Sequence, residues 1–462
     1  MKSVEQNSGV PLVSVGILSA FTIDFVLNST FVCEGIEYSG EQRVLLQDDK
    51  ILWKGGLYDQ LEFLPLTTAL KSNEASFTLK EVIIGVGFHW ERREDQTFRG
   101  SLKLIIEGDK ITAVNLVDVE EYLISVISSE MSATASLELL KAHSVISRSW
   151  LFAQIEKRQK AVDNREVVHL EKRYNSEGCV EEYIKWYDGG DHLNFDICAD
   201  DHCQRYQGIT RASTTLASEA VESTRGVLLT YNGEICDARY SKCCGGMLER
   251  FESCWEEQEH PYLVAKRDIS LKSDLIQQSE FTPYPNLTLE ENAKRWILSS
   301  PESFCNSCDK DILSQVLNNY DRETVNFYRW RVEYRAEELS QLIFKRSGID
   351  YGIIIDLIPV ERGASGRIIK LKIVGSKRIC IIGKELEIRR TLSESHLYSS
   401  AFVIEREFGA EGKCEKFILH GAGWGHGVGL CQIGAAVMGE KGFSFKEILS
   451  HYYVGASLES RY

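Results

Sequence analysis

One glutamate stands where a carboxylate could act as a general acid. Glu130 lies in the run Ser128-Ser129-Glu130-Met131, between two segments that read as helices. A carboxylate at a helix end, close to apolar side chains, can have its pKa raised by loss of solvent, which suits an acid catalyst. The alternative is a structural role in which Glu130 caps the second helix, and position alone favours this alternative.

Thiol and imidazole side chains form a second group, with the ligand types that zinc prefers. His192, Cys198, His202 and Cys203 supply two thiols and two imidazoles within twelve residues. These are the ligands of tetrahedral Cys₂His₂ zinc sites. Their spacing differs from that of a zinc finger, and a surface loop with one buried cysteine pair is the alternative.

The chain has thirteen cysteines, and an odd number in a chain of this length does not describe a disulfide framework. Several cysteines cluster instead in short segments with metal-like spacing. Cys305-x-x-Cys308, together with Cys243 and Cys244, could form a second thiolate site, although no adjacent histidine supports it.

A glycine-rich stretch near the C-terminus is the third candidate. Residues 420–436 read HGAGWGHGVGLCQIGAA and contain six glycines. Glycine permits positive φ and close backbone approach but weakens regular helices and strands, so the stretch predicts a loop whose shape matters. His426 lies between two glycines that leave it little side-chain cover. A turn between two core elements is the alternative.

The elements that would position these residues change along the chain. Residues 11–117 alternate as strands do, and residues 118–160 take a helical period. We expect Asp118 to cap a first helix through Ile127 and a second helix to run from Ser136 to Lys157. Residues 155–190 are charged and lack a pattern, which predicts a surface excursion.

The second half of the chain returns to strands. A helix-like stretch, Leu287–Leu298, lies in a polar segment, residues 327–406 alternate strongly, and a last helix is expected at Ser444–His451. The order predicts an α+β fold with a β-rich N-terminal part, a central helical pair carrying the acid, and a mixed strand core with an insertion and the glycine-rich loop. The expected division is 1–105, 106–262 with the metal loop, the insertion 263–326, and 327–462.

Bulk composition limits the partners. The net charge of −15 argues against nucleic acid and against electrostatic attachment to an anionic membrane. No apolar run approaches the roughly 20 residues of a membrane span. The N-terminus does not read as a standard signal peptide, so a cytoplasmic location stays open.

Several motifs together resemble one family. Val119-Glu120-Glu121-Tyr122-Leu123, Ser129-Glu130-Met131 and the run from Leu140 to Trp150 look like the helical signature of the stage II sporulation protein D / LytB family (SpoIID). GWGHGVGLCQIGA, followed by Ile448–Tyr453, resembles the second signature of that family. Residues that depart from the family pattern are Ser128, Ala135-Ser136 and His143, the last in place of a glutamine.

The resemblance implies an activity on cell-wall glycan. It implies that Glu130 is the catalytic acid of a lytic transglycosylase that cuts between N-acetylmuramic acid and N-acetylglucosamine. Arg148 would orient substrate or pair with the acid, and His426 would contact substrate or face the acid across a cleft. The residues expected to bind substrate are Tyr240, Ser241, Gly425, Gly427 and Gln432.

The same resemblance leaves a second function open. LytB-like relatives are described as enhancers of a wall amidase, so the alternative is a non-catalytic wall-binding protein with an amidase partner. The zinc would be structural, and the implied location is the cell envelope or another extracytoplasmic site. The role in sporulation, wall turnover or recycling stays open.

Overall fold

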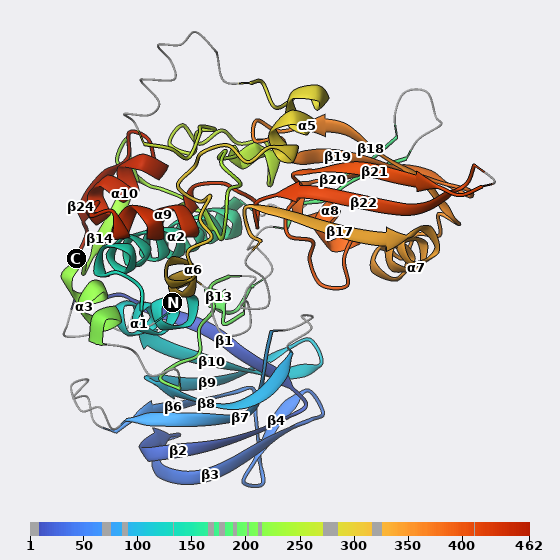
Figure 1. The fold of residues 1–462 in the computed structure, drawn as a ribbon. Coiled ribbons are helices and arrows are strands. Elements are labelled where there is room, and N and C mark those ends of the chain that lie inside the picture. Colours follow the sequence, from blue (N-terminus) through green and yellow to red (C-terminus); the bar gives the residue numbers. More distant parts are fainter. Residues whose placement is uncertain are drawn as a thin grey trace.

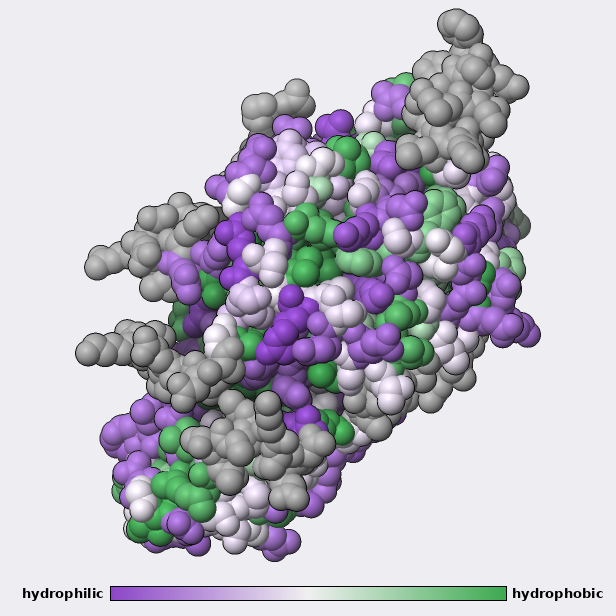
Figure 2. Space-filling view, turned by 90° about the vertical axis from the view of Figure 1, so that its left-hand side faces the viewer, coloured by the Kyte–Doolittle hydropathy of each residue, from purple (hydrophilic) through white to green (hydrophobic). Residues whose placement is uncertain are grey.

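The computed structural model describes residues 9–66, 75–85, 91–132, 134–164, 171–174, 181–187, 192–200, 203–210, 215–270, 285–316, 326–410 and 412–462. Figure 1 shows a β-rich N-terminal part below, a group of helices above it, and a second β-rich part beside the helices. The predicted α+β class is confirmed. Hydrophobic side chains on the face seen in Figure 2 lie in small groups separated by hydrophilic ones.

The N-terminal part is a large, mainly antiparallel sheet. Its strands are β1 (Leu12–Ala20), β2 (Thr22–Cys33), β3 (Ile36–Gln47), β4 (Lys50–Trp53), β5 (Gly56–Tyr58), β6 (Gln60–Pro65), β7 (Ser76–Ile84), β8 (Arg92–Arg99), β9 (Ser101–Glu107) and β10 (Lys110–Asp118). Their order is β1-β10-β9-β6-β2-β3-β4-β5, with β7 between β2 and β8. Alternate residues of β2, such as Ile23, Phe25 and Leu27, are buried, as one face of a strand requires. The expected boundary at residue 105 falls inside β9, and β10 belongs to the same sheet.

The predicted helical pair is present. α1 (Val119–Glu130) begins at Asp118, whose carboxylate accepts the N–H of Glu120 at 2.8 Å. α2 (Leu137–Asn164) starts where expected and continues seven residues beyond the expected end at Lys157. The helices packed with this pair are α3 (Thr215–Ser223), α9 (Gln432–Glu440) and α10 (Phe445–Tyr452).

The stretch expected as a surface excursion contributes to a sheet, so that expectation is wrong in part. Its first residues extend α2, and β11 (Glu171–Tyr174) and β12 (Glu181–Ile184) follow. β12 pairs in parallel with β20 (Ile379–Gly383). The side chain of Ile184 is buried there, and a buried apolar contact of this kind between distant segments has no local sequence signal.

The second β-rich part has its own hydrophobic core. Its strands are β17 (Arg329–Arg335), β18 (Ile354–Arg362), β19 (Ile368–Gly375), β20, β21 (Phe402–Phe408) and β22 (Cys414–Ala422). They form the sheets β11-β12-β20-β19-β18 and β17-β22-β21. Two helices that the alternating pattern did not predict lie here, α7 (Ala336–Ser347) and α8 (Glu385–Thr391).

Short elements connect the two halves. The expected helix-like stretch is α5 (Glu290–Leu298), and the same segment also holds α6 (Lys310–Val316). The 3₁₀ turn η2 (Phe251–Ser253) lies before this segment. β14 (Val227–Tyr231) pairs with β15 (Glu234–Ile235) and with β24 (Ser457–Ser460) near the C-terminus. β13 (Ile197–Cys198) extends the N-terminal sheet beside β1. β16 (Tyr240–Ser241) pairs in parallel with β23 (Leu430–Cys431).

Arg148 pairs with Glu120 in the interior rather than, as was expected, with Glu130. Its side chain is fully buried, and its guanidinium donates to both carboxylate oxygens of Glu120, at 2.6 and 3.1 Å. The same carboxylate accepts the hydroxyl of Tyr462 at 2.7 Å, and the guanidinium also donates to the carbonyl of Val227. The expected pairing of Arg148 with Glu130 is therefore wrong. The ion pair joins α1, α2, β14 and the C-terminus.

Replacing Arg148 by methionine should destabilise the fold strongly. The change leaves the Glu120 carboxylate buried without its cation, which costs about 3–5 kcal/mol. Urea unfolding followed by circular dichroism measures this free energy. Arg225→Met is the matched control, because Arg225 pairs with Glu222 at the surface, where an ion pair contributes about 0–1 kcal/mol. Equal stability of the two variants would contradict a supporting role for the buried pair.

Candidate active site and metal-binding groups

Glu130 is the last residue of α1, and its side chain is half-buried. Its Oε1 accepts the backbone N–H of Arg205 at 3.4 Å. The segment that carries Arg205 follows α1 closely, since Gln204 Oε1 accepts the hydroxyl of Tyr122 at 3.0 Å and the N–H of Gln207 donates to Ser125 Oγ at 3.2 Å. Residues 203–207 thus support the side chain of Glu130.

The predicted metal loop lies directly before this segment. The ligand atoms of His192, Cys198 and Cys203 all lie within 4.8 Å of one another, and His192 Nε2 is 3.5 Å from Cys203 Sγ. His202, the fourth predicted ligand, lies outside the described residues. An imidazole and two thiols this close fit three positions of a tetrahedral zinc site. Cys203 is two residues from Arg205, so a metal bound here would hold the backbone that contacts Glu130.

The glycine-rich stretch begins in β22, turns through residues 423–429 and continues through β23 into α9, a helix that the sequence did not predict. Its glycines face the protein's own chain. Gly423, Gly427 and Gly429 all have positive φ, and a Cβ at Gly429 would lie 2.0 Å from the carbonyl oxygen of Arg239. A Cβ at Gly427 would lie 2.5 Å from the buried guanidinium of Arg367. The expectation that Gly427 leaves room for a sugar ring is therefore wrong, because protein atoms fill that side.

His426 is half-buried between these glycines, with its ring 4.9 Å from that of Trp255. Its Nδ1 accepts the N–H of Val428 at 3.0 Å. Burial, and then the charges of Arg239 and Arg367, hold the pKa of His426 well below its usual value. The ring is therefore neutral near pH 7, and the hydrogen bond to Nδ1 assigns its proton to Nε2. Hydrogen bonds to the backbone of Val428 and of Tyr240 hold the neutral ring within the loop.

Arg239, which the sequence did not single out as a site residue, lies near both candidate groups. It pairs with Asp237, and its guanidinium stacks over Trp255 at 4.3 Å. Its charge acts on His426 and also on Cys203, whose raised pKa comes first from Cys198 and then from burial. Arg239 thus links the glycine-rich loop to the segment that supports Glu130. The closeness of His426 to Glu130 itself stays a prediction.

Two of the expected substrate-binding residues serve the interior. Gln432 is 2% exposed, and its Nε2 lies 3.1 Å from Nε2 of the buried His143. Ser241 Oγ accepts the N–H of Gly427 at 3.2 Å. The contact between Gln432 and His143 joins the first signature, on α2, to the second, at the start of α9. A substrate role for Gln432 has no support in this geometry.

Tyr240 and Gly425 keep some exposure, and aromatic rings lie close to them. The half-buried Tyr240 packs edge-on against His143 at 4.6 Å. Trp424, beside Gly425, stacks on Phe327 at 4.7 Å and contacts Tyr398 at 4.9 Å. Trp424 and Tyr398 are half-buried as well. Aromatic faces of this kind provide large apolar contact area, and nothing in the local sequence around Tyr398 predicted its position.

The protein combines an α+β fold with three local features. These are a glutamate at a helix end, a thiol–imidazole group, and a glycine-rich loop that carries a neutral histidine. Residues 107–231 match the family described as Stage II sporulation protein, and residues 249–429 match a domain of unknown function, DUF8618. Residues 107–231 thus resemble the SpoIID/LytB family, as the motifs predict.

Three relatives show how far the similarity reaches. The chain is 28% identical over 272 residues to the amidase enhancer of Bacillus subtilis, a match that covers 56% of this chain and 34% of that protein. It is 22% identical over 354 residues to the stage II sporulation protein D of Bacillus amyloliquefaciens, covering 75% of each chain. An uncharacterised protein of Brachyspira hyodysenteriae is 25% identical over 361 residues, covering 78% of this chain and 72% of its own. The chain thus spans about a third of the amidase enhancer and most of the other two.

Replacing Gly427 by valine should reduce stability more than the same change at Gly442. Both glycines have positive φ, but a Cβ at Gly442 meets no atom within 4 Å, whereas one at Gly427 meets Arg367. Backbone strain alone costs about 1–3 kcal/mol, and overpacking adds about as much again. Thermal and urea unfolding of both variants separate the cost of backbone strain, which both share, from the cost of overpacking, which only Gly427→Val has. If Gly427→Val were as stable as Gly442→Val and yet inactive, blocked access to the loop would be the better explanation.

His143 should make the fold sensitive to acid. Burial, and then the charge of Lys242, lower the pKa of His143 to about 3, against about 6.5 in the unfolded chain. The unfolded state therefore binds more protons below pH 6.5, and stability falls as the pH drops toward 3. At pH 4 this one group accounts for about 3 kcal/mol.

The test is the free energy of unfolding between pH 7 and 4. His143→Gln, which restores the residue type typical of the family and can still bond Gln432, should have a shallower pH dependence than the wild type. An unchanged slope in the variant would show that His143 is not a source of the acid sensitivity.

Proposed function

We propose that the chain cleaves glycan strands of peptidoglycan between N-acetylmuramic acid and N-acetylglucosamine, with Glu130 as the general acid. The observation that carries this proposal is the position of Glu130. It is half-buried at the end of α1, inside the matched family domain, and a backbone N–H from a separately anchored segment contacts it. A carboxyl group held in this way can be presented to a glycosidic oxygen at a fixed distance.

The reaction would need only this one carboxyl group. Glu130 donates its proton to the glycosidic oxygen, the bond to the muramic acid C1 breaks, and the 6-hydroxyl of the same sugar attacks C1 to close an anhydro ring. The proton of that hydroxyl returns to the Glu130 carboxylate. Inverting and retaining hydrolases use a second carboxylate to activate water or to form a glycosyl intermediate, and the internal hydroxyl takes its place here.

The loop and the aromatic residues would bind the sugar. His426 would shape the loop, since its ring already bonds the backbone of Val428 and of Tyr240. The half-buried rings of Trp424 and Tyr240 offer faces for sugar packing. Gly425 belongs to the same surface, whereas Ser241 and Gly427 act through the shape of the loop.

We assign a structural zinc to His192, Cys198 and Cys203, with His202 as the fourth ligand. The first three residues fit it by geometry. The metal would fix residues 203–207 and, through Arg205, the acid. The division into four regions stays a proposal, except that its first boundary moves to the end of β10, because residue 105 lies inside β9.

The proposed location is the cell envelope, where the glycan lies. No helix among the described residues is long and apolar enough to cross a membrane. Nucleic acid is not a proposed partner, because the chain carries a net charge of −15.

The second candidate function is enhancement of a wall amidase. It is favoured by the match to a relative named amidase enhancer, although that match covers only a third of the relative. In that case the loop and Glu130 would bind glycan without cutting it, and an N-acetylmuramoyl-L-alanine amidase would be the partner.

Glu130→Gln should remove cleavage while leaving the fold intact, because the amide cannot donate the carboxyl proton. Loss of a general acid reduces rate on the order of 10²–10⁴-fold. Peptide-free glycan strands are incubated with each protein, and anhydro-muramyl ends are counted by mass spectrometry. Glu121→Gln is the matched control on the same helix, since Glu121 pairs with Arg99 at the surface.

The outcomes separate the two functions. Wild-type rates in Glu130→Gln would remove Glu130 from the mechanism. A wild-type protein that makes no new ends but accelerates a purified wall amidase would establish the enhancer function instead.

A further inference from the structure

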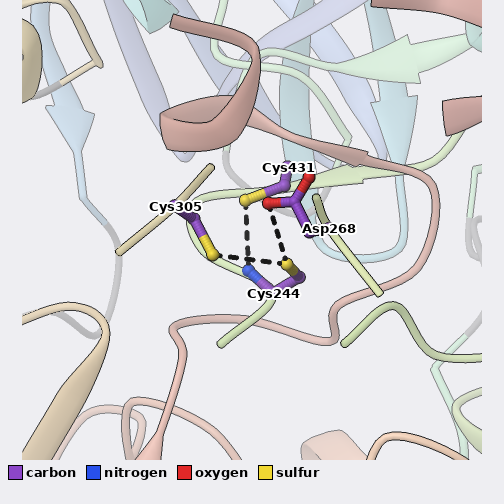
Figure 3. A group of neighbouring side chains, drawn as sticks. All are labelled: Cys244, Asp268, Cys305 and Cys431. Carbon is purple, nitrogen blue, oxygen red and sulfur yellow. Dashed lines mark hydrogen bonds between the residues drawn. The ribbon is translucent and has the colours of Figure 1, made fainter. Parts of the chain in front are cut away.

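A second group of ligand side chains lies in the interior, apart from the His192 group. Cys244, Asp268, Cys305 and Cys431 direct their ligand atoms toward one another (Figure 3), and these atoms all lie within 4.8 Å of one another. Each of the four residues is at most 2% exposed. Cys308, which the sequence grouped with Cys305, is exposed and is not part of the group. The spacing of the cysteines did not predict that Asp268 or Cys431 would belong to the group.

The sulfur distances suit a single metal ion. In a tetrahedral zinc site with Zn–S of about 2.3 Å, two ligand sulfurs lie about 3.8 Å apart. The sulfurs of Cys244 and Cys305 are 3.5 Å apart, and Cys244 Sγ is 3.5 Å from Asp268 Oδ2. A disulfide requires about 2.05 Å. An iron–sulfur cluster places its thiolates on different irons, which a group this compact does not favour.

The carboxylate is oriented as a ligand would be. Asp268 Oδ1 accepts the hydroxyl of Tyr452 at 2.9 Å and lies 3.2 Å from His451 Nε2. Its other oxygen, Oδ2, is thereby directed to the thiols. Polar groups that bond a metal ligand from behind fix its orientation in this way.

The thiols have similar support. The backbone N–H of Cys244 lies 3.2 Å from the sulfur of Cys431, and Ser303 Oγ lies 3.2 Å from that of Cys305. Backbone bonds fix the segments as well, since the N–H of Phe304 donates to the carbonyl of Asp268 at 2.7 Å. Donors near sulfur stabilise a thiolate, which is the form that binds metal.

We infer that Cys244, Asp268, Cys305 and Cys431 bind one zinc ion in a buried structural site. Three thiolates and a carboxylate are ligands that zinc accepts, and four protein ligands leave no position open for water or substrate, as in structural sites. Burying a carboxylate with thiolates is costly without a compensating cation, and the divalent ion supplies that charge.

The site would join parts of the chain that lie far apart in sequence. Cys431 ends β23 directly after the glycine-rich loop, and Cys244 follows β16, its partner strand. Asp268 and Cys305 belong to the region expected as an insertion and matched by the domain of unknown function. The metal therefore holds that region against the base of the loop.

The test is the zinc content of the full chain, purified under reducing conditions and measured by elemental mass spectrometry. We expect two zinc ions per wild-type chain. Cys244→Ser/Cys305→Ser should contain one, and Cys198→Ser/Cys203→Ser should contain one. Cys308→Ser is the matched control, because it removes a cysteine three residues from Cys305 outside the group, and it should keep both ions.

Three results would overturn the assignment. The first is a Cys244→Ser/Cys305→Ser variant with as much zinc as Cys308→Ser. The second is a disulfide in place of the ion. Thiol titration of the unfolded wild-type chain would then find two thiols fewer without reductant than with it, and the chain would contain no zinc beyond the His192 group. The third concerns Cys243, which also contacts Cys305 and Cys431: if Cys243→Ala lost the ion and Asp268→Asn kept it, the ligands would be four thiolates.

If Cys244→Ser/Cys305→Ser does not fold, a second variant still tests the metal site. Asp268→Asn keeps the shape of the side chain, removes its charge and should lose the second zinc during dialysis against a chelator. Cobalt bound to the wild-type chain should show sulfur-to-metal absorption that Asp268→Asn reduces and Cys308→Ser leaves unchanged. Wild-type absorption in Asp268→Asn would reject Asp268 as a ligand. None of these measurements depends on glycan cleavage, so the site is tested independently of the proposed function.

Discussion

The close backbone contact between residues 239–245 and residues 423–431 is the constraint on which the site depends. β16 pairs with β23, and Cys243 and Trp424 exchange backbone hydrogen bonds at 2.9 and 2.8 Å. Glycine is needed where the Cα atoms of the loop approach the partner segment, because a Cβ at Gly423 would lie 2.7 Å from the carbonyl oxygen of Cys243 and one at Gly429 2.0 Å from that of Arg239. The spacing of the glycines in the second signature follows from this packing rather than from contact with a ligand.

Two buried side chains keep the contact in place. Arg367 donates to the carbonyls of Gly425, at 3.0 and 3.1 Å, and of Cys244 at 3.3 Å, and thus bonds to both segments at once. Glu249 receives the N–H groups of Ala364 and Ser365, and its own N–H donates to the carbonyl of Gly427 at 2.9 Å. Because each buried polar group has several partners, loss of one would leave others unsatisfied. The loop is therefore rigid through contacts with the second β-rich part.

The sequence predicted the α+β class, the helical pair with its Asp118 cap, and the closeness of His192, Cys198 and Cys203, because each depends on local spacing or on a family motif. It did not predict the partner of Arg148, since a charge on a helix face gives no sign of which carboxylate it will meet. Gln432 and Gly427 were expected to bind substrate because the family resemblance implies it, yet tertiary packing uses both internally. Arg239, Asp268 and Cys431 were missed for the same reason, because their neighbours come from distant segments.

These contacts give a structural role to residues that lie between the two family signatures and match the domain of unknown function. Glu249, Asp268, Cys305 and Arg367 all lie in residues 249–429, and each bonds to the loop or to the strands at its base, directly or through the cysteine group. Residues 249–367 therefore supply partners of Gly425, Gly427 and Cys431, and a peripheral addition would not have these contacts. Because the matched residues 249–429 also contain most of the glycine-rich loop, the loop and the residues that bond to it form one structural unit.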